Sequence, residues 1–364
     1  MRAAISLVLV FIACRSPQPA AGQSGRDDQL RVPDGFKISI FAQNLQGVRY
    51  LALGPAKAIY ASQPASGRIV KLTDRNNDGV ADTTIGVAQG LHGPFGIAFR
   101  GDTMYVAEER QVIRFDPPPG RTEPVTIISR IPAGGHSTRT ILFGPDGKLY
   151  LSVGSSCNLC DERDSLRAAV SQFNRDGSGG RIFAKGLRNT VGMAFNPTTG
   201  ELWGNNNDRD NLGDDIPPEH VNIIKDGRNY GWPQCYLPGK QNPEYGSADC
   251  SQVEPPVITV PAHTAPLGLA FYTGTQFPAD YRGDAFMTLH GSWNRSVPAG
   301  AKVVRVQVDS GGGRATGVDD FITGWQRPDG SRWGRPVGLV VLPDGSLLVS
   351  DDMGGKIWRV SYGR

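Results

Sequence analysis

The sequence has no concentrated charge of either sign. Charged residues make up 20% of the 364 positions, and the formal net charge is +3 without a long run of one sign. Proteins that bind nucleic acids usually carry a basic face or stripe. The composition therefore predicts no nucleic-acid partner.

Beyond the N-terminus the chain also lacks a stretch of the ~18 apolar residues that would span a bilayer. The start of the chain is different, because Arg2 precedes an apolar run from Ala3 to Ala13 that ends at Cys14. A basic start followed by a short apolar stretch is typical of a secretory signal. We expect residues 1–14 to be a signal peptide and the protein to be exported to the periplasm.

The segment at 11–14 resembles a bacterial lipobox, in which Cys14 would be lipidated, although Phe11 is unusual at the first position. Ordinary cleavage after Ala20 or Ala21 is the alternative. In both cases residues 15–30 are expected to be a flexible tether. If Cys14 is lipidated, the tether would anchor the protein to the membrane as a lipoprotein that faces the periplasm or the exterior.

Few cysteines follow Cys14: the chain has Cys157, Cys160, Cys235 and Cys250. An even number in an oxidising compartment predicts disulfides, and we expect the pairs closest in sequence, 157 with 160 and 235 with 250. A redox or zinc site at 157–160 is the alternative, which the lack of a second C-x-x-C disfavours. No C-x-x-C-H occurs, so no haem attachment is expected.

Glycine and proline are abundant, with 47 and 27 residues, which favours many short strands joined by turns. An apolar strand, a turn and a second strand recur at 140–150, 191–203 and 337–349, with weaker copies at 50–60, 95–105 and 267–287. The first copies lie about 45–50 residues apart, as propeller blades do. The sequence predicts an all-β, six-bladed β-propeller over residues 31–364. Long loop insertions at 206–262 and 288–335 are expected on one face, and residues 36–41 should close the ring beside 356–360.

Four stretches along this repeat, at 134–150, 186–195, 205–233 and 290–295 together with the 155–160 loop, resemble one family. They are similar to segments of the soluble PQQ-dependent glucose and sorbosone dehydrogenases. The resemblance implies that the chain oxidises an aldose or a related aldehyde with PQQ and Ca²⁺ and passes electrons to an external acceptor. It further implies that His136 is the general base, that Arg188 donates to the quinone oxygen and that Asn189 holds the ring.

The same resemblance places Ca²⁺ near the acidic loop after residue 205. Clustered oxygen ligands suit Ca²⁺, and we expect the PQQ-bound ion near Asn207 to Arg209, including Asp208. A second ion is expected near Asp214, Asp215 and Glu219. A solvated acidic loop is the alternative.

A separate loop carries oxygens at Asp74, Asn76, Asp78 and Asp82, with Gly79 at the sixth position. It matches the first half of an EF-hand loop but lacks the glutamate at position 12. We expect either a structural Ca²⁺ site or a polar turn.

Cations for the PQQ carboxylates are expected at Arg295, Lys302 and Arg335, with Arg332 as a substitute for Arg335, because arginine recognises carboxylates well. His92 stands where the glucose enzymes have a glutamine, and it is a candidate cofactor or substrate contact. Trp293 is a candidate stacking platform or a core residue.

Two other functions fit the sequence. A non-catalytic propeller lipoprotein that binds carbohydrate or an envelope partner needs no residue set such as His136 and Arg188. A metal-dependent lactonase would hold its ion with carboxylates from several blades, whereas here the acidic residues concentrate in one insertion.

Overall fold

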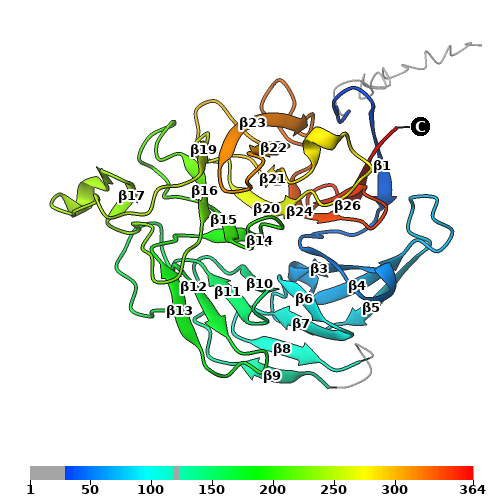
Figure 1. Cartoon of the computed structure of the whole chain (residues 1–364), viewed down its shortest axis with the longest axis horizontal. Coiled ribbons are helices and arrows are strands. Elements are labelled where there is room, and N and C mark those ends of the chain that lie inside the picture. Colours follow the sequence, from blue (N-terminus) through cyan, green and yellow to red (C-terminus); the bar gives the residue numbers. More distant parts are fainter. Residues whose placement is uncertain (1–28, 118–122, 364) are drawn as a thin grey trace, which may run out of the picture.

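The computed structural model describes residues 29–117 and 123–363, and these form an all-β propeller. Six four-stranded antiparallel sheets surround a central axis and follow one another in chain order (Figure 1). The predicted six-bladed propeller is therefore confirmed. The expected signal peptide, Cys14 and residues 15–28 of the expected tether lie outside the described residues. Leu30, which we expected in the tether, is buried in the core.

The first three blades each use four consecutive strands. Blade one contains β2 (Leu51–Leu53), β3 (Ile59–Gln63), β4 (Arg68–Thr73) and β5 (Thr83–Ala88). Blade two contains β6 (Ile97–Arg100), β7 (Thr103–Ala107), β8 (Val112–Phe115) and β9 (Val125–Ile128). Blade three contains β10 (Arg139–Phe143), β11 (Leu149–Val153), β12 (Ala169–Phe173) and β13 (Arg181–Lys185).

The later blades carry the expected long insertions. Blade four contains β14 (Thr190–Phe195), β15 (Leu202–Asn206), β16 (Glu219–Ile223) and β19 (Ile258–Val260), and its insertion forms the hairpin of β17 (Cys235–Leu237) and β18 (Lys240–Gln241). Blade five contains β20 (Pro266–Phe271), β21 (Ala285–Leu289), β22 (Lys302–Val308) and β23 (Ala315–Ile322). Short 3₁₀ turns lie at η1 (Pro55–Lys57), η2 (Pro64–Ser66), η3 (Pro243–Tyr245) and η4 (Ala279–Tyr281).

Blade six joins the two ends of the described chain. Its strands are β24 (Pro336–Val341), β25 (Leu347–Asp351), β26 (Lys356–Tyr362) and β1 (Phe36–Ala42). Strand β1 pairs antiparallel with β26, so the N-terminal segment closes the ring as predicted. Phe36 anchors this closure, because its ring packs edge-on against Phe277 at 4.8 Å and Phe321 at 5.1 Å. Each such aromatic pair contributes about 0.5–1.5 kcal/mol beyond its buried area.

The repeated Pro-Asp-Gly turn joins the first two strands of blades three and six. In blade three the backbone of Gly147 has φ 74°, a left-handed conformation that glycine adopts without steric cost. The Asp146 carboxylate accepts a hydrogen bond from the Lys148 amide at 3.0 Å and so stabilises the turn. The second strand that follows, β11, is buried along its whole length and packs between neighbouring blades.

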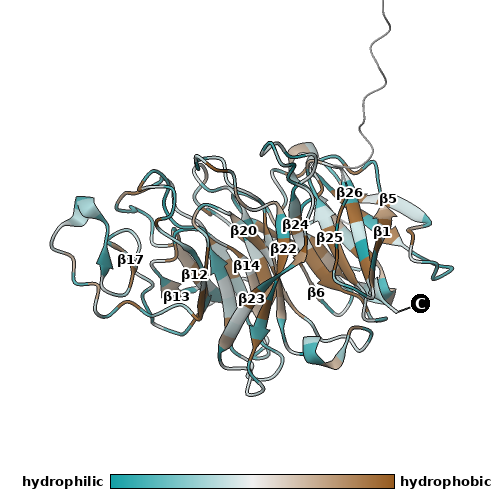
Figure 2. Cartoon of the chain, turned by 90° about the horizontal axis from the view of Figure 1, so that it is seen from above, coloured by the Kyte–Doolittle hydropathy of each residue, from teal (hydrophilic) through white to brown (hydrophobic). Residues whose placement is uncertain are grey.

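Both predicted disulfides are present, Cys157–Cys160 in the loop after β11 and Cys235–Cys250 beside the β17–β18 hairpin. In the side view the hairpin extends outward from the body of the propeller (Figure 2). Within the described residues no helix has the length and apolar character that crossing a membrane requires.

Candidate functional site

The candidate site lies at one mouth of the central channel. The inner strands β2, β6, β10, β14, β20 and β24 contact one another around the axis. Because every blade repeats the same strand order, the starts of these inner strands all face the same mouth. His136, Arg188, Asn189 and Arg335 lie within three residues before their inner strands, so the topology gathers them there. The loops that follow each second strand end at the same mouth.

Below this mouth the channel is filled by apolar side chains. Phe95, Val191, Leu267 and Val337 form one buried cluster contributed by four inner strands or the residues just before them. The space left between the inner strands is only about 30 Å³, roughly the volume of one water molecule. The channel below the mouth therefore has no room for a planar ligand.

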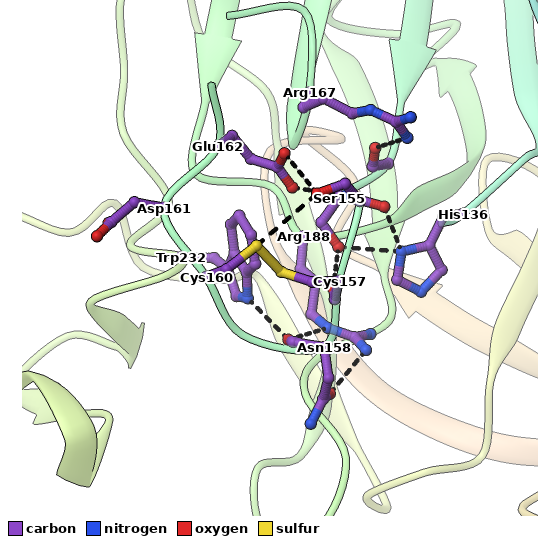
Figure 3. Close-up of a disulfide and its surroundings, with 12 residues drawn as sticks. His136, Ser155, Cys157, Asn158, Cys160, Asp161, Glu162, Arg167, Arg188 and Trp232 are labelled. Atoms are coloured by element: carbon purple, nitrogen blue, oxygen red, sulfur yellow. Dashed lines mark hydrogen bonds between the residues drawn. A yellow bond between two sulfur atoms is a disulfide. The ribbon is translucent and has the colours of Figure 1, made fainter. Parts of the chain in front are cut away.

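His136 is held by a serine of the neighbouring loop. Its Nδ1 lies 3.0 Å from both the carbonyl oxygen and the hydroxyl of Ser155 (Figure 3). Burial, followed by the positive charge of Arg188, lowers the pKa of His136 to about 4. The imidazole is therefore neutral at pH 7, and its Nε2 makes no hydrogen bond within residues 29–117 and 123–363.

Arg188 is almost fully buried, and all five of its N–H groups have partners. Nε and Nη2 donate to the backbone and side-chain oxygens of Asn158 at 3.0 and 2.9 Å, and Nη1 donates to the Asp208 carbonyl at 2.6 Å. The remaining bonds reach the Asn207 carbonyl at 3.2 Å and the Asp210 carboxylate at 3.1 Å. Arg188 thus joins the disulfide loop of blade three to the acidic loop of blade four. Its expected contact to a quinone oxygen stays a prediction.

Asn189 lies beside His136 with an uncommitted amide. A Cβ added to Gly154 would come within 2.5 Å of the Asn189 Oδ1 and 2.7 Å of the His136 Cβ, so both residues border the same space. The Asn189 side chain makes no hydrogen bond to any described residue, while its backbone carbonyl accepts from the Asn207 amide at 3.0 Å. This amide is available to a ligand next to the imidazole.

Asp208 and Glu219 form a buried pair of carboxylates. The Glu219 carboxylate accepts a hydrogen bond from the Asp208 amide at 2.7 Å, and the Asp208 carboxylate lies 3.5 Å from Nε2 of His220. Burial raises the pKa of Glu219 to about 8, and the Asp208 carboxylate adds to this rise. Buried carboxylate oxygens such as these are ligands that suit a hard divalent cation.

The structure does not bring Asp214 and Asp215 to Glu219. Their loop is tied instead to Arg295, whose guanidinium donates to the Asp214 carbonyl and to the Asp215 carboxylate, the latter at 2.9 Å. The Asp215 side chain is 86% exposed, whereas Glu219 is buried. The second Ca²⁺ site at these residues therefore stays a prediction. The positive charge of Arg295 is already paired with the Asp215 carboxylate.

A cluster of arginines lies at the mouth beside blades five, six and one. The Arg335 guanidinium donates to the carbonyls of His290 and Gly291, both at 2.9 Å. Arg49 lies 3.3 Å from Asp352, which also lies 3.1 Å from Nε2 of His290. Burial lowers the pKa of Arg49 and of Arg335, and the Asp352 charge opposes this in both.

Sequence reasoning missed Arg49 and Asp352. A signal was present for Arg49, since it precedes its inner strand by two residues, the same register that Arg188 occupies before β14. Arg332, the proposed substitute for Arg335, joins the same group, and burial also lowers its pKa. The Asp352 charge acts on Arg49 and Arg335, whereas Arg332 donates to the Gln326 side chain at 3.2 Å and to the Ala299 carbonyl at 3.3 Å.

Other predicted residues lie away from this group. Lys302 pairs with Asp320 of the outer strand β23 at 2.5 Å. The His92 side chain is 86% exposed and borders a groove of about 530 Å³ between blades one and two. Trp293 is 73% exposed on the loop between β21 and β22, so the interpretation as a core residue is wrong.

The acidic side chains of the loop at 74–82 accept hydrogen bonds from the loop's own backbone amides. The Asp74 carboxylate accepts from the Asp78 and Gly79 amides at 3.2 and 2.9 Å, and Asn76 donates to Asp78 at 2.9 Å. The Asp82 carboxylate accepts from the Arg75 amide at 2.5 Å. The geometry is that of a polar turn, and a Ca²⁺ ion there stays a prediction.

Among the described residues, one group of three potential metal ligands converges, Cys157, Cys160 and Glu162. The two sulfur atoms are joined in a disulfide, so they are not available as thiolate ligands. The alternative of a zinc site at 157–160 does not fit this bonded state.

The chain was compared with protein families, curated proteins and solved structures. An uncharacterised protein of Borreliella burgdorferi is 30% identical over 92% of this chain and 91% of that protein. The pyrroloquinoline quinone-dependent pyranose dehydrogenase of Coprinopsis cinerea is 26% identical over 96% of this chain, which spans 56% of that enzyme's length.

Solved structures share the fold. The holo form of the PQQ domain of the Coprinopsis cinerea pyranose dehydrogenase has a TM-score of 0.78 at 24% identity and matches 95% of this chain and 98% of that domain. A calcium structure of a Trichoderma reesei carbohydrate-active enzyme of family AA12 has a TM-score of 0.81 at 21% identity and matches 93% and 98% of the two chains.

The family model described as TrAA12-like matches residues 30–243 and 237–363, which is nearly the whole propeller. Together with the six-bladed fold and the residues gathered at one mouth of its channel, this match shows that the chain belongs to the TrAA12-like family.

Proposed function

We propose that this protein oxidises an aldose or a related aldehyde or hydroxyl substrate with PQQ and Ca²⁺, and that His136 is the general base. The observation that carries the proposal is the neutral imidazole of His136, whose Nε2 is free beside the uncommitted amide of Asn189. Similar proteins include a pyrroloquinoline quinone-dependent pyranose dehydrogenase, a pyrroloquinoline quinone-dependent sugar dehydrogenase and an aldose sugar dehydrogenase.

The arginine cluster fits a ligand with several carboxylates. The Nε of Arg49 is buried without a hydrogen-bond partner, and an unsatisfied buried donor is costly unless a ligand completes it. Arg332 and Arg335 add positive charge whose burial lowers their pKa values. The three carboxylates of PQQ would relieve this excess of buried cations. When bound, PQQ would accept two electrons in the form of a hydride from the carbon that is oxidised.

On the opposite side of the mouth, Asp208 and Glu219 suit Ca²⁺. The raised pKa of Glu219 means that this carboxyl holds a proton at pH 7 when no cation is near. A divalent ion would replace that proton and allow the Glu219 carboxyl to ionise. Backbone carbonyls at Asn207 and Asp208 are already used by Arg188, but a carbonyl oxygen has a second lone pair.

His136 then receives the proton that the substrate loses. Nδ1 faces the Ser155 carbonyl, an acceptor, so Nδ1 carries the hydrogen and Nε2 presents a lone pair. As hydride leaves the substrate carbon, Nε2 takes the hydroxyl proton and a carbonyl product forms. The nearby Arg188, Arg167 and Arg139 favour release of that proton, since each lowers the pKa of the imidazole.

Reconstitution tests the proposal directly. The purified protein, freed of quinone and metal, should reduce an artificial electron acceptor only after both PQQ and Ca²⁺ are added, with a panel of aldoses and aldehydes as substrates. Activity that persists after exhaustive chelation and quinone removal would contradict the proposal. A protein that binds a sugar tightly but never reduces the acceptor would favour the alternative of a non-catalytic binding propeller.

The acid limb of the pH profile should lie unusually low. His136 is neutral above its pKa of about 4, so at saturating Ca²⁺ we expect kcat/KM to fall only as the pH drops through about 4. A free histidine would give a limb near pH 6.5. Circular dichroism at each pH separates loss of the base from loss of fold. A limb near pH 6.5 in the folded protein would contradict the neutral-base assignment.

Trp293 offers an exposed aromatic face for a sugar ring. Trp293→Ala should raise KM about 2- to 10-fold, the range of one aromatic contact, and leave Tm unchanged because the side chain is 73% exposed. Val297→Ala is the matched control, since Val297 lies on the same loop and is 71% exposed. Equal KM values for the two variants would remove Trp293 from the substrate site.

A further inference from the structure

The hydrogen bonds of His136 depend on one serine. Ser155 offers two acceptors to Nδ1, its carbonyl and its hydroxyl, each at 3.0 Å, and its carbonyl also accepts from the His136 backbone amide at 3.0 Å. The imidazole is therefore fixed at its backbone and at one ring nitrogen by the same residue. This arrangement leaves Nε2 as the unprotonated nitrogen.

Ser155 is itself fixed on both sides. Its amide donates to the Arg188 carbonyl at 2.7 Å, and its hydroxyl donates to the Cys157 carbonyl at 2.7 Å. Because the hydroxyl proton points to Cys157, the oxygen lone pairs of Ser155 face the imidazole. A chain of hydrogen bonds thus runs from Nδ1 through the serine hydroxyl to the Cys157 carbonyl, and such chains strengthen each member.

The Cys157–Cys160 disulfide closes a ring around that carbonyl. The two Cα atoms lie 6.2 Å apart, and the bridge joins residues only three positions apart. Within the ring, Asn158 accepts from Arg188 and from the Asp210 amide, so one side of the ring is tied to blade four (Figure 3). The following residues, 161–165, are mostly exposed. The crosslink therefore fixes the position of the Cys157 carbonyl, because the exposed residues that follow it have few contacts that could fix it.

No carboxylate of residues 29–117 or 123–363 bonds to the imidazole. Glu162 bonds to the amide and hydroxyl of Ser156, and Glu109 accepts from the Gly134 amide at 2.8 Å. Neither bonds to His136, whose charged neighbours are Arg188, Arg167 and Arg139. A neutral serine is the partner that orients the ring, and its backbone hydrogen bond raises the pKa of His136 less than burial and the charge of Arg188 lower it.

We propose that Ser155, anchored by the Cys157–Cys160 ring, is the positioning residue that sets the tautomer and orientation of His136. The proposal rests on the function proposed above only for its catalytic consequence, because the tautomer itself is a property of the protein without cofactor. The disulfide then serves the site directly, whereas Cys235–Cys250 lies beside the outlying β17–β18 hairpin.

Nitrogen NMR of the cofactor-free protein tests the positioning. The chain has only five histidines, so a His136→Gln variant identifies the His136 signals. In the wild type we expect a protonated Nδ1 and an unprotonated Nε2. Ser155→Ala removes the hydroxyl and keeps the carbonyl acceptor, so it should raise the fraction of the Nε2-protonated tautomer in part, and Cys157→Ser/Cys160→Ser should raise it too. Cys235→Ser/Cys250→Ser is the matched control and should leave the wild-type spectrum of His136.

Kinetics of the loaded protein provide the second readout. In Ser155→Ala we expect reduction of bound PQQ at saturating substrate to slow about 3- to 10-fold, the range of one hydrogen bond, with PQQ affinity unchanged within about twofold. Reductant added to the Cys235→Ser/Cys250→Ser protein opens only the 157–160 bridge and should slow the same step reversibly. This reduction experiment can be done even if the Cys157→Ser/Cys160→Ser variant does not fold.

Three results would overturn the positioning role: an Nε2-protonated His136 in the wild type, a wild-type tautomer ratio in Ser155→Ala, or a full rate after the bridge is opened. Failure of the proposed function is seen separately. If His136→Ala retains the wild-type rate while Ser155→Ala shifts the tautomer, the base assignment is wrong and the positioning of the ring by Ser155 stands.

Discussion

His136→Ala should slow reduction of bound PQQ by the substrate about 10²- to 10⁴-fold, the usual cost of losing a general base. Within the described chain, Nε2 of His136 is the basic nitrogen beside Asn189. It is neutral and makes no hydrogen bond. Stopped-flow measurement of quinone reduction at saturating substrate isolates this step from acceptor binding.

Affinity for PQQ should change little in the same variant, because the expected carboxylate partners are on the far side of the mouth, at Arg49, Arg332 and Arg335. Spectral titration measures that affinity. His136→Gln is the matched control for packing, since glutamine retains a donor for the Ser155 carbonyl but provides no base. A wild-type rate in either variant would end the mechanistic claim even if the cofactor were confirmed.

The two sides of the mouth differ in charge, and this difference matches the expected cofactor. Arg49 and Arg335 lie beside blades six and one, while Asp208 and Glu219 lie in blade four. A planar molecule with carboxylates at one end and a Ca²⁺-binding edge at the other would meet complementary groups on both sides. His136 of blade three lies between Arg49 and Asp208 in chain order.

The fold was predictable because its signals are local. An apolar strand followed by a Pro-Asp-Gly turn is recognisable within a dozen residues, and Gly147 and Gly345 have the positive φ that the turn requires. Residues next to inner strands were predictable for the same reason. His136, Arg188 and Asn189 needed only the propeller topology to be brought together.

Residues in long loops were not predictable in this way, because no strand register determines their path. Asp214 and Asp215 share a loop with Asp208, yet they lie with Arg295 at the rim. The partners of Arg188 were also hidden, because three of its five bonds reach backbone carbonyls. Backbone carbonyls occur at every residue, so side-chain patterns do not reveal which of them converge.

Arg188→Ala should lower stability as well as activity, in contrast to His136→Ala. The side chain is 4% exposed and connects Asn158 to the carbonyls of Asn207 and Asp208. Removing one partner of such a buried charged network costs about 3–5 kcal/mol, so we expect a fall in Tm of roughly 5–10 °C in the cofactor-free protein. Arg181→Ala is the matched control, because Arg181 makes a bidentate pair with Asp226 but is 44% exposed. An exposed pair contributes about 0–1 kcal/mol.

The thermal shift on adding PQQ and Ca²⁺ separates the two roles of Arg188. If Arg188 also donates to the quinone oxygen, the variant should lose most of the Tm increase that the cofactor gives the wild type, and quinone reduction should slow about 10²-fold or more. If Arg188 only joins the two loops, the cofactor should restore Tm by the wild-type increment from the lower starting value. An unchanged Tm without cofactor would contradict the five-bond network itself, because those bonds exist before any ligand is bound.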